Sequence, residues 1–279
     1  MTKKMINVFP VDPVENHRDR EKGVLVYPVY SRRSEGLSVG INLFPDRKIC
    51  SFDCPYCEVF PFSTNAEFSA EQMEEDLRAV ISSEQEQVKD ICFSGSGEPT
   101  MSKYFPEALE RAARVRQDMA KEAELVLITN GSFVLNGQLF SLLVEAAAAS
   151  PAFNIWLKLD AGTPEWYKKM SRSGLPFEKM ICKIKEFTAK APVTIQTMIC
   201  AVDGAGPPPE EAGAWEKLVT EIVESAAANG NAVRKVQIYG KARPSPEDPK
   251  AAALPVRHLE KRAVSLRSKI TSPEVKVYP

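Results

Sequence analysis

Histidine is scarce in this sequence, which has only two among 279 residues, and neither lies near the cysteine-rich stretch described below. An excess of one charge is also missing, because 36 lysines and arginines stand against 37 aspartates and glutamates, a net charge of −1. A balanced chain does not attract nucleic acid over its whole surface, which argues against broad nonspecific binding to RNA or DNA. Local basic clusters such as 18–22 and 32–33 remain, either as contacts or as solvated surface charge.

Signals for export and for membrane insertion are absent too. The segment MTKKMINVFPVDP does not form a signal peptide, and every apolar run is broken by charge or proline before it could span a membrane. We therefore expect a protein of the reducing cytoplasm, where six cysteines do not form a disulfide framework. Cys92, Cys182 and Cys200 stand alone in apolar contexts and are expected to pack as small hydrophobic residues. Cys200 is also a candidate radical relay.

The composition, 44% hydrophobic and 26% charged, is that of a globular chain that can bury a full core. No strong linker divides it, because the proline-rich stretches 204–209 and 244–255 are short and follow predicted strands. We predict an N-terminal extension over residues 1–37, a barrel domain over 38–245 and a C-terminal helical tail over 246–279.

Short β-branched runs alternate with longer amphipathic stretches along the chain. Six runs are predicted as strands, at 38–43, 89–93, 124–129, 154–159, 192–199 and 234–239. Helices are expected at 69–83, 104–121, 137–149, 177–187 and 210–228. A strand followed by a helix, repeated with room for a crossover, predicts a parallel sheet with helices outside it. Six such units predict an α/β fold, a partial (β/α)6 barrel with parallel strands.

In parallel α/β folds the loops after the carboxyl ends of the strands carry the chemistry. The unusual segments of this chain follow the predicted strands one by one. They are ICSFDCPYC, SGSGEP, NGS, DAGTP, DGAGPPP and GKARPSP. All of them are therefore predicted at one face of the barrel.

The first of these segments places three cysteines in eight positions, at Cys50, Cys54 and Cys57. This spacing suits a tight loop around one inorganic centre. Structural zinc takes four protein ligands, and a catalytic zinc held by three thiolates would be a poor Lewis acid. An iron–sulfur cluster fits better, and a cluster held by three cysteines leaves one iron free to bind another molecule.

The pattern CxxxCxxC, with Tyr56 before the last cysteine, resembles the signature of radical S-adenosylmethionine (SAM) enzymes. The resemblance implies a [4Fe-4S] cluster on Cys50, Cys54 and Cys57 whose open iron binds SAM. It also implies that an electron from the cluster cleaves SAM to a 5′-deoxyadenosyl radical, which abstracts hydrogen from a substrate.

Further segments resemble the positions from which this family reaches its cofactor. The segment that looks like the family's Gly-Gly-Glu motif, which contacts the methionine end of SAM, comprises Gly95, Ser96, Gly97 and Glu98. The positions that resemble contacts to the ribose and carboxylate are Thr129, Asn130, Lys158 and Asp160. Asn-Gly is also an ordinary turn, and the lysine and aspartate can form a structural ion pair. The residues expected to line the adenine and substrate are Tyr56, Gln196, Ile199 and Ile238.

Other stretches are similar to a subgroup related to wyosine-base enzymes, which modify tRNA. They are YPVYSRR at 27–33, GLSVGINLFP at 36–45, and VQIY to ARP within 236–244. Archaeal wyosine-base enzymes carry a second cluster on extra N-terminal cysteines, whereas residues 1–49 of this sequence contain no cysteine. The eukaryotic counterparts add a flavodoxin-like module, which is not found in this sequence either. We therefore expect an external flavodoxin or ferredoxin to supply the electron. Arg32, Arg33 and Arg243 are candidates for binding an anion.

The substrate class stays open between a tRNA base, a peptide side chain and a small metabolite, because the lateral gap of a half-open barrel admits each of them. The missing basic tail favours a small or medium substrate. A competing hypothesis is a noncatalytic iron–sulfur or zinc protein that binds a partner or RNA and never cleaves SAM. The scarcity of histidine does not exclude an enzyme, since a cofactor can carry the hard chemistry.

Overall fold

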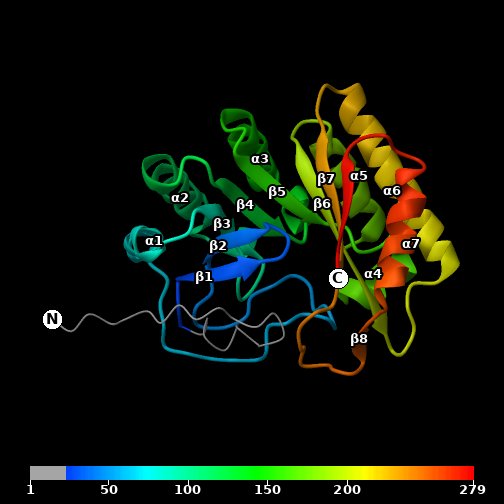
Figure 1. Cartoon of the computed structure of the whole chain (residues 1–279), viewed down its shortest axis with the longest axis horizontal. Helices are drawn as coiled ribbons and strands as arrows, with labels where there is room; N and C mark the ends of the chain where they lie inside the picture. The colour runs from blue at the N-terminus through cyan, green and yellow to red at the C-terminus, as the bar shows by residue number, and fades with distance from the viewer. Residues whose placement is uncertain (1–22) are drawn as a thin grey trace.

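The computed structural model describes residues 23–279, and its main feature is one curved, mostly parallel β-sheet with helices on its outer side (Figure 1). The predicted strands are all present, as β2 (Gly36–Ile41), β3 (Val88–Phe93), β4 (Glu124–Thr129), β5 (Phe153–Lys158), β6 (Val193–Val202) and β7 (Val233–Gly240). They lie in the sheet in chain order, each parallel to the next. The predicted partial barrel of the α/β class is therefore confirmed.

The predicted helices are present as α1 (Ala70–Ser83), α2 (Phe105–Met119), α3 (Gly137–Ala149), α5 (Phe177–Thr188) and α6 (Pro209–Ala228). Helix α4 (Pro164–Ser171) and the 3-10 turns η2 (Pro99–Met101) and η3 (Ser132–Leu135) have no counterpart among the predictions. The Ser69 hydroxyl accepts a hydrogen bond from the backbone N–H of Gln72 and caps α1. In a full capping box the Gln72 side chain would bond back to the backbone N–H of Ser69. Here it donates to Asp76, so only the Ser69 half of the box forms. Within residues 23–279, no helix is both long and apolar enough to cross a lipid bilayer.

The edges of the sheet come from strands that the sequence analysis does not predict. Strand β1 (Val26–Ser31) pairs antiparallel with β2, and β9 (Glu274–Tyr278) pairs parallel with β7. A short strand, β8 (Ala251–Ala253), pairs antiparallel with β6, and α7 (Val256–Arg267) lies between β8 and β9. The C-terminal segment thus holds a helix, as expected, together with two strands. The division into extension, barrel and tail stays a prediction, and residues 1–22 lie outside the described part of the chain.

The turn of the β1–β2 hairpin reaches the opposite edge of the sheet. Glu35 in this turn forms an ion pair with Lys276 of β9, and its carboxylate lies 3.5 Å from the Tyr278 hydroxyl. The two edges, separated by most of the chain, are thereby connected. The side opening expected of a half-barrel is spanned by this turn.

The two faces of the sheet have different characters because side chains alternate along a strand. Large apolar residues on the outer face, among them Ile91, Leu127 and Ile195, pack against the helices in the main core. On the inner face Cys92, Val126 and Trp156 form a separate small cluster, and polar side chains stand beside it. The interior of the half-barrel is therefore suited to a polar ligand.

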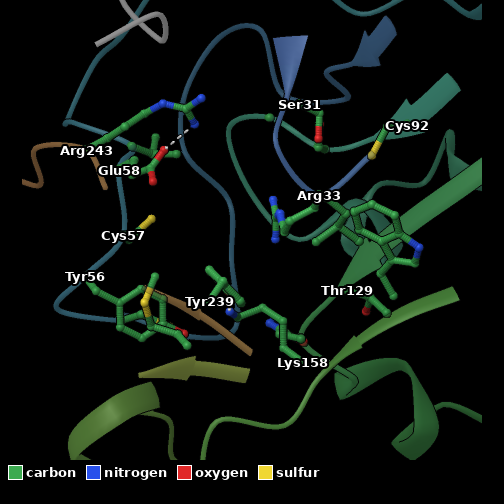
Figure 2. A pocket seen from close by; sticks show the side chains of 18 of the residues that line it. Ser31, Arg33, Tyr56, Cys57, Glu58, Cys92, Thr129, Lys158, Tyr239 and Arg243 are labelled. Carbon is green, nitrogen blue, oxygen red and sulfur yellow. Dashed lines mark hydrogen bonds and ion pairs between the residues drawn. The ribbon is translucent and has the colours of Figure 1, made fainter. Parts of the chain in front are cut away.

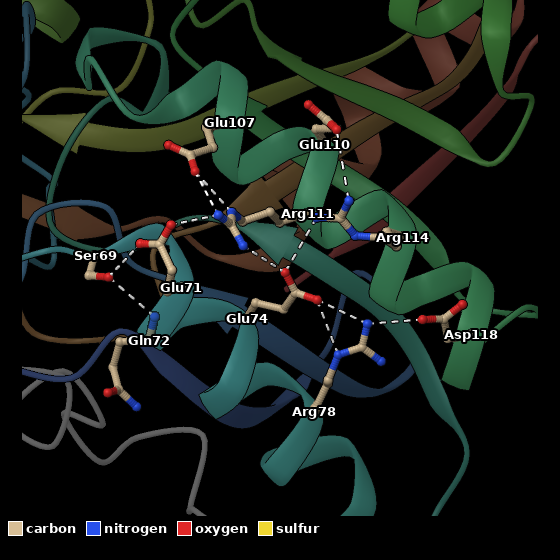
Figure 3. A network of polar contacts seen from close by, with 10 residues as sticks. All are labelled: Ser69, Glu71, Gln72, Glu74, Arg78, Glu107, Glu110, Arg111, Arg114 and Asp118. Atoms are coloured by element: carbon tan, nitrogen blue, oxygen red, sulfur yellow. Dashed lines mark hydrogen bonds and ion pairs between the residues drawn. The ribbon is translucent and has the colours of Figure 1, made fainter.

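Helices α1 and α2 are joined by ion pairs on the outside of the molecule (Figure 3). Glu74 of α1 lies at the centre, 3.0 Å from both Arg78 and Arg111 and 3.4 Å from Arg114. Its side chain is only 17% exposed. The hydrogen bond from Arg78 is the main reason that the pKa of the Glu74 carboxyl is lowered.

Candidate active site

The main pocket has a volume of about 240 Å3 and lies where several strands end (Figure 2). Its walls come from the cysteine loop, the loop after β3, the ends of β4, β5 and β7, and the β1–β2 hairpin. The segments DAGTP and DGAGPPP, which follow β5 and β6, do not line it. The loops after β2, β3, β4 and β7 thus converge, whereas those after β5 and β6 lie aside.

The three cysteines of the first loop line this pocket as partly buried free thiols. A backbone hydrogen bond from Cys57 N to Cys54 O, 3.0 Å long, holds the loop turned. The Cys50 sulfur accepts hydrogen bonds from Phe52 N at 3.4 Å and from Asn130 Nδ2 at 3.6 Å. Burial raises the pKa of Cys50 to about 11 and that of Cys54 to about 12. Binding a metal centre as thiolates would therefore release protons.

The cysteine loop and the loop after β3 are paired side by side. Glu98 N donates to Ile49 O at 2.8 Å, and Ile49 N donates to Ser96 O at 3.2 Å. A Cβ atom on Gly97 would lie 2.0 Å from Ile49 O, so only glycine fits there. Gly95 has a φ of +121°, a conformation that favours glycine. Both glycines line the pocket, but the close approach that Gly97 permits is to the cysteine loop, whereas the sequence analysis expects an approach to the cofactor.

Glu98 locks the loop after β3 to the end of β4. Its carboxylate accepts hydrogen bonds from Thr100 N and Oγ1 at 3.2 and 2.6 Å, from Thr129 Oγ1 at 2.7 Å and from Asn130 N at 2.7 Å. Burial raises the pKa of the Glu98 carboxyl against the effect of these donors. The Asn130 side chain also donates to Ser51 Oγ at 3.0 Å. Three loops are therefore fixed relative to one another.

A buried network connects the cysteine loop to β5 and β7. Lys158 lies 3.2 Å from the Asp160 carboxylate and also contacts the Tyr239 hydroxyl, while the Tyr56 hydroxyl donates to Asp160. Burial would lower the pKa of Lys158, but Asp160 and Tyr239 outweigh it and the pKa is raised. The lysine is therefore positively charged at neutral pH. The structural ion pair considered for Lys158 and Asp160 is present.

The structure brings most of the predicted site residues to the pocket. Those that line it are Cys50, Cys54, Tyr56, Cys57, Gly95, Gly97, Glu98, Thr129, Asn130 and Lys158. Ser96 is buried behind the loop, with its N–H bonded to Asn42 Oδ1 at 3.1 Å. Asp160 lines two small neighbouring cavities instead.

Ile199 and Ile238 are not brought to the pocket, because they lie in the main core. Gln196 and Gln237 are direct register partners on β6 and β7, and their side chains are hydrogen-bonded at 2.6 Å. They therefore share the inner face of the sheet, although neither of them is among the residues that line the main pocket. Residues three positions apart in a strand point to opposite faces, so Ile199 cannot share the face of Gln196.

Of the lone cysteines, Cys200 is fully buried beside Met198 and Tyr239 and packs as predicted. Burial raises its pKa to about 12. Cys92 packs in the inner cluster and also lines the pocket. The prediction for Cys182 is wrong, because this residue is exposed on α5. The buried side of α5 is formed by Met180, Ile184 and Phe187, and position 182 points away from it.

Several pocket residues are missing from the sequence-based site. Trp156 and Ile128 line it from the inner face, and Tyr27 and Ser31 line it from the hairpin. The Tyr27 hydroxyl lies 2.9 Å from Ser94 Oγ, which joins the hairpin to the loop after β3. The inner-face residues could be found from the strands themselves, because they alternate with the core residues.

Comparison with known sequences connects this site to a family. Residues 47–205 match the model of the Radical SAM superfamily. A UPF0026 protein of Synechocystis sp. is 29% identical over 181 residues, which are 62% of this chain and 63% of that protein. A UPF0026 protein of Helicobacter pylori is 27% identical over 168 residues, 57% of this chain and 48% of that protein. The chain thus spans about half to two thirds of the length of the curated relatives it matches.

Solved structures share the fold at low sequence identity. A radical SAM methyltransferase from Sphaerobacter thermophilus has a TM-score of 0.61 and 16% identity, over 91% of this chain and 69% of that one. Streptococcus suis SuiB bound to S-adenosylmethionine has a TM-score of 0.57 and 14% identity, over 85% and 50%. A spore photoproduct lyase variant has a TM-score of 0.58 and 10% identity, over 100% and 89%. These likenesses concern the partial-barrel fold.

Proposed function

Because this chain belongs to the radical SAM superfamily of enzymes, we propose that Cys50, Cys54 and Cys57 hold a [4Fe-4S] cluster that binds SAM in the main pocket. When bound, a reduced cluster would supply the one electron that breaks a sulfonium C–S bond of SAM, and SAM would supply the 5′-deoxyadenosyl group that takes a hydrogen atom from the substrate. The observation that carries this proposal is the placement of three free thiols in one pocket that continues into the barrel.

The chemistry of the donors fits such a cluster. Thiolates are the usual ligands of iron–sulfur clusters, and N–H groups that donate to the sulfurs stabilise their negative charge. Cys50 receives such bonds from Phe52 and Asn130. Among the residues that the structure describes, no three His, Cys, Asp or Glu side chains are placed to hold a single metal ion. The thiol donors and the family together support Cys50, Cys54 and Cys57 as ligands of an iron–sulfur cluster.

We assign the cofactor contacts to the residues that line the pocket near this loop. Direct contacts are proposed for Tyr56, Gly95, Gly97, Thr129 and Asn130. The buried Glu98 positions Thr129 and Asn130, and Asp160 positions Tyr56 and Lys158. Ser96 and Gln196 support this wall from behind, and Ile199 and Ile238 have no part in it.

Radical SAM enzymes need an electron donor, and we propose a flavodoxin or ferredoxin in a cytoplasmic setting. The relationship to wyosine-base enzymes is supported by sequence motifs alone, and the curated relatives are UPF0026 proteins. Two of those motifs place Arg33 and Arg243 at the pocket. The proposed substrate is a tRNA base, a peptide side chain or a metabolite from which the enzyme abstracts hydrogen.

The test is anaerobic reconstitution with iron and sulfide, followed by SAM and dithionite. We expect wild type to bind iron and to release 5′-deoxyadenosine, and Cys57→Ala to lose both. Cys182→Ala is the matched control, because it removes an exposed thiol from α5. If wild type binds a four-iron cluster and yet releases no 5′-deoxyadenosine, the proposal fails.

A further inference from the structure

The turn between β1 and β2 carries Arg33, whose side chain extends into the main pocket (Figure 2). Its Nη1 donates a hydrogen bond to Gln196 Oε1 at 3.1 Å, and Gln196 donates in turn to Gln237 Oε1 at 2.6 Å. Its guanidinium carbon lies 4.8 Å from the centre of the Tyr239 ring and 5.7 Å from that of Trp156. Neutral amides and aromatic rings thus hold this guanidinium in place.

None of these partners carries a negative charge. Within residues 23–279, neither Arg33 nor its neighbour Arg32 forms an ion pair with a carboxylate. The other cations of the pocket differ in this respect. Arg243 lies 3.2 Å from the Glu58 carboxylate, and Lys158 lies 3.2 Å from that of Asp160.

The acids of the pocket are occupied elsewhere. Glu58 pairs with Arg243, and the carboxylate oxygens of Glu98 accept hydrogen bonds from Thr129, Asn130 and the following turn. Arg32 is exposed at the rim of the pocket, and its pKa is lowered by local desolvation of the guanidinium and by the positive charges of Arg243 and Arg33. Glu58 acts on Arg32, and Asp90 on Arg33, only from beyond ion-pair distance, so neither guanidinium is in direct contact with one of these carboxylates.

A positive charge that is partly removed from water requires a counter-charge or a polar ligand. Guanidinium presents five N–H donors in a planar fork that matches carboxylate and phosphate groups. Gln196 takes only one of these bonds. We propose that the substrate of this enzyme carries a carboxylate or phosphate group, and that Arg33, assisted by Arg32, binds this group.

This inference rests on the proposed function only in calling the bound molecule the substrate. Figure 2 shows Arg33 toward the middle of the pocket, with Cys57 on one side and Cys92 on the other. An anion bound to Arg33 would lie in the same pocket as the cysteine loop. The volume of about 240 Å3 is large enough for a small acid or for the acidic end of a larger molecule.

The experiment measures binding of simple probes to the full chain without cluster by ligand-observed NMR. The probes are benzoate, phenyl phosphate and the uncharged benzamide. The variants are Arg33→Gln, Arg33→Lys, which keeps the charge but loses the fork, and Arg257→Gln. Arg257 is the matched control because it is an exposed arginine on α7, remote from the lining of the pocket. Thermal melting verifies that each variant folds.

We expect wild type and Arg257→Gln to bind at least one anionic probe and to ignore benzamide. Arg33→Gln should weaken that binding about tenfold or more, since a hydrogen bond to a charged group is lost, and Arg33→Lys should lie between. Tighter binding of benzoate assigns a carboxylate, and tighter binding of phenyl phosphate assigns a phosphate. No binding of either anion, equal binding of benzamide, or an unchanged Arg33→Gln would overturn the proposal.

A second measurement separates substrate from cofactor, because SAM has a carboxylate of its own. In anaerobically reconstituted protein, SAM and the anionic probe should bind together. Displacement of the probe by SAM would assign Arg33 to the cofactor and overturn the proposal. Failure of the proposed function appears independently, as absent 5′-deoxyadenosine from cluster-loaded protein, while anion binding to the cluster-free chain is unaffected.

Discussion

Replacing Gly97 by alanine should push apart the cysteine loop and the loop after β3. The added Cβ would lie 2.0 Å from Ile49 O and 2.8 Å from a ring carbon of Phe44. A carbon–oxygen contact needs about 3.3 Å, so the loops would have to separate by roughly 1 Å. That movement breaks two hydrogen bonds, Glu98 N to Ile49 O and Ile49 N to Ser96 O. Each is worth about 1 kcal/mol, and overpacking adds about 1–3 kcal/mol. We therefore expect a loss of about 3–5 kcal/mol in unfolding free energy.

The matched control is Gly213→Ala, because a Cβ at Gly213 of α6 meets no atom within 4 Å. Alanine in an exposed helix position should stabilise the protein by up to about 1 kcal/mol. Urea unfolding of the cluster-free chains measures both changes, and iron binding after reconstitution shows whether the cysteine loop stays in place. If Gly97→Ala unfolds at the urea concentration of wild type, the close packing of the two loops is refuted.

Two further predictions concern charge and thiol reactivity. Glu74→Gln should cost about 1 kcal/mol at neutral pH, as expected for a charge at the centre of an ion-pair network. Because the folded pKa of Glu74 is lowered, this contribution is present above about pH 4.3, the unfolded value, and is lost as the pH falls through the folded pKa. Urea unfolding at several pH values measures it, with the exposed Glu75→Gln as control, and an equal effect of both variants would contradict it. In cluster-free protein, iodoacetamide should label the exposed Cys182 well before Cys54. Burial raises the pKa of Cys54 to about 12, so little of the reactive thiolate is present at neutral pH. Mass spectrometry of the alkylated peptides measures the order, and faster labelling of Cys54 would refute the burial.

Local pattern predicts most of the fold. The run at 124–129 is β-branched and apolar because β4 is covered on both faces, and the strand has the expected ends. Helix α3 also has its predicted bounds, between the capping Asn136 and Ser150. The edge strands are harder to predict, since β1 contains Pro28 and mixes exposed and buried positions. Strand β9 has only five residues, and pairing with β7, which fixes it, is a tertiary property.

The site can be predicted from the sequence where a local motif carries the chemistry. It cannot be predicted where a side chain reaches the site from a distant part of the fold. The cysteine spacing and the segment SGSGEP indicate the loops that form the pocket wall. Nothing local indicates that Arg33 crosses the interior to Gln196, because that depends on how the hairpin lies over the sheet. Ile199 lies away from the main pocket for a simpler reason, since strand alternation places it on the face opposite to Gln196.

The hairpin turn that joins the two edges of the sheet through Glu35 and Lys276 also forms part of the pocket wall, because Arg32, Arg33 and Ser34 line the pocket. In a half-barrel without such a contact, a polymer could enter through the side opening between the two edges of the sheet. Here the hairpin turn contacts β9 across that opening. A small acid needs only the mouth of the pocket, but a folded RNA or protein would have to offer a single protruding base or side chain. We therefore expect this turn to limit by size what enters the pocket, and a longer or shorter turn to change which substrates the enzyme accepts.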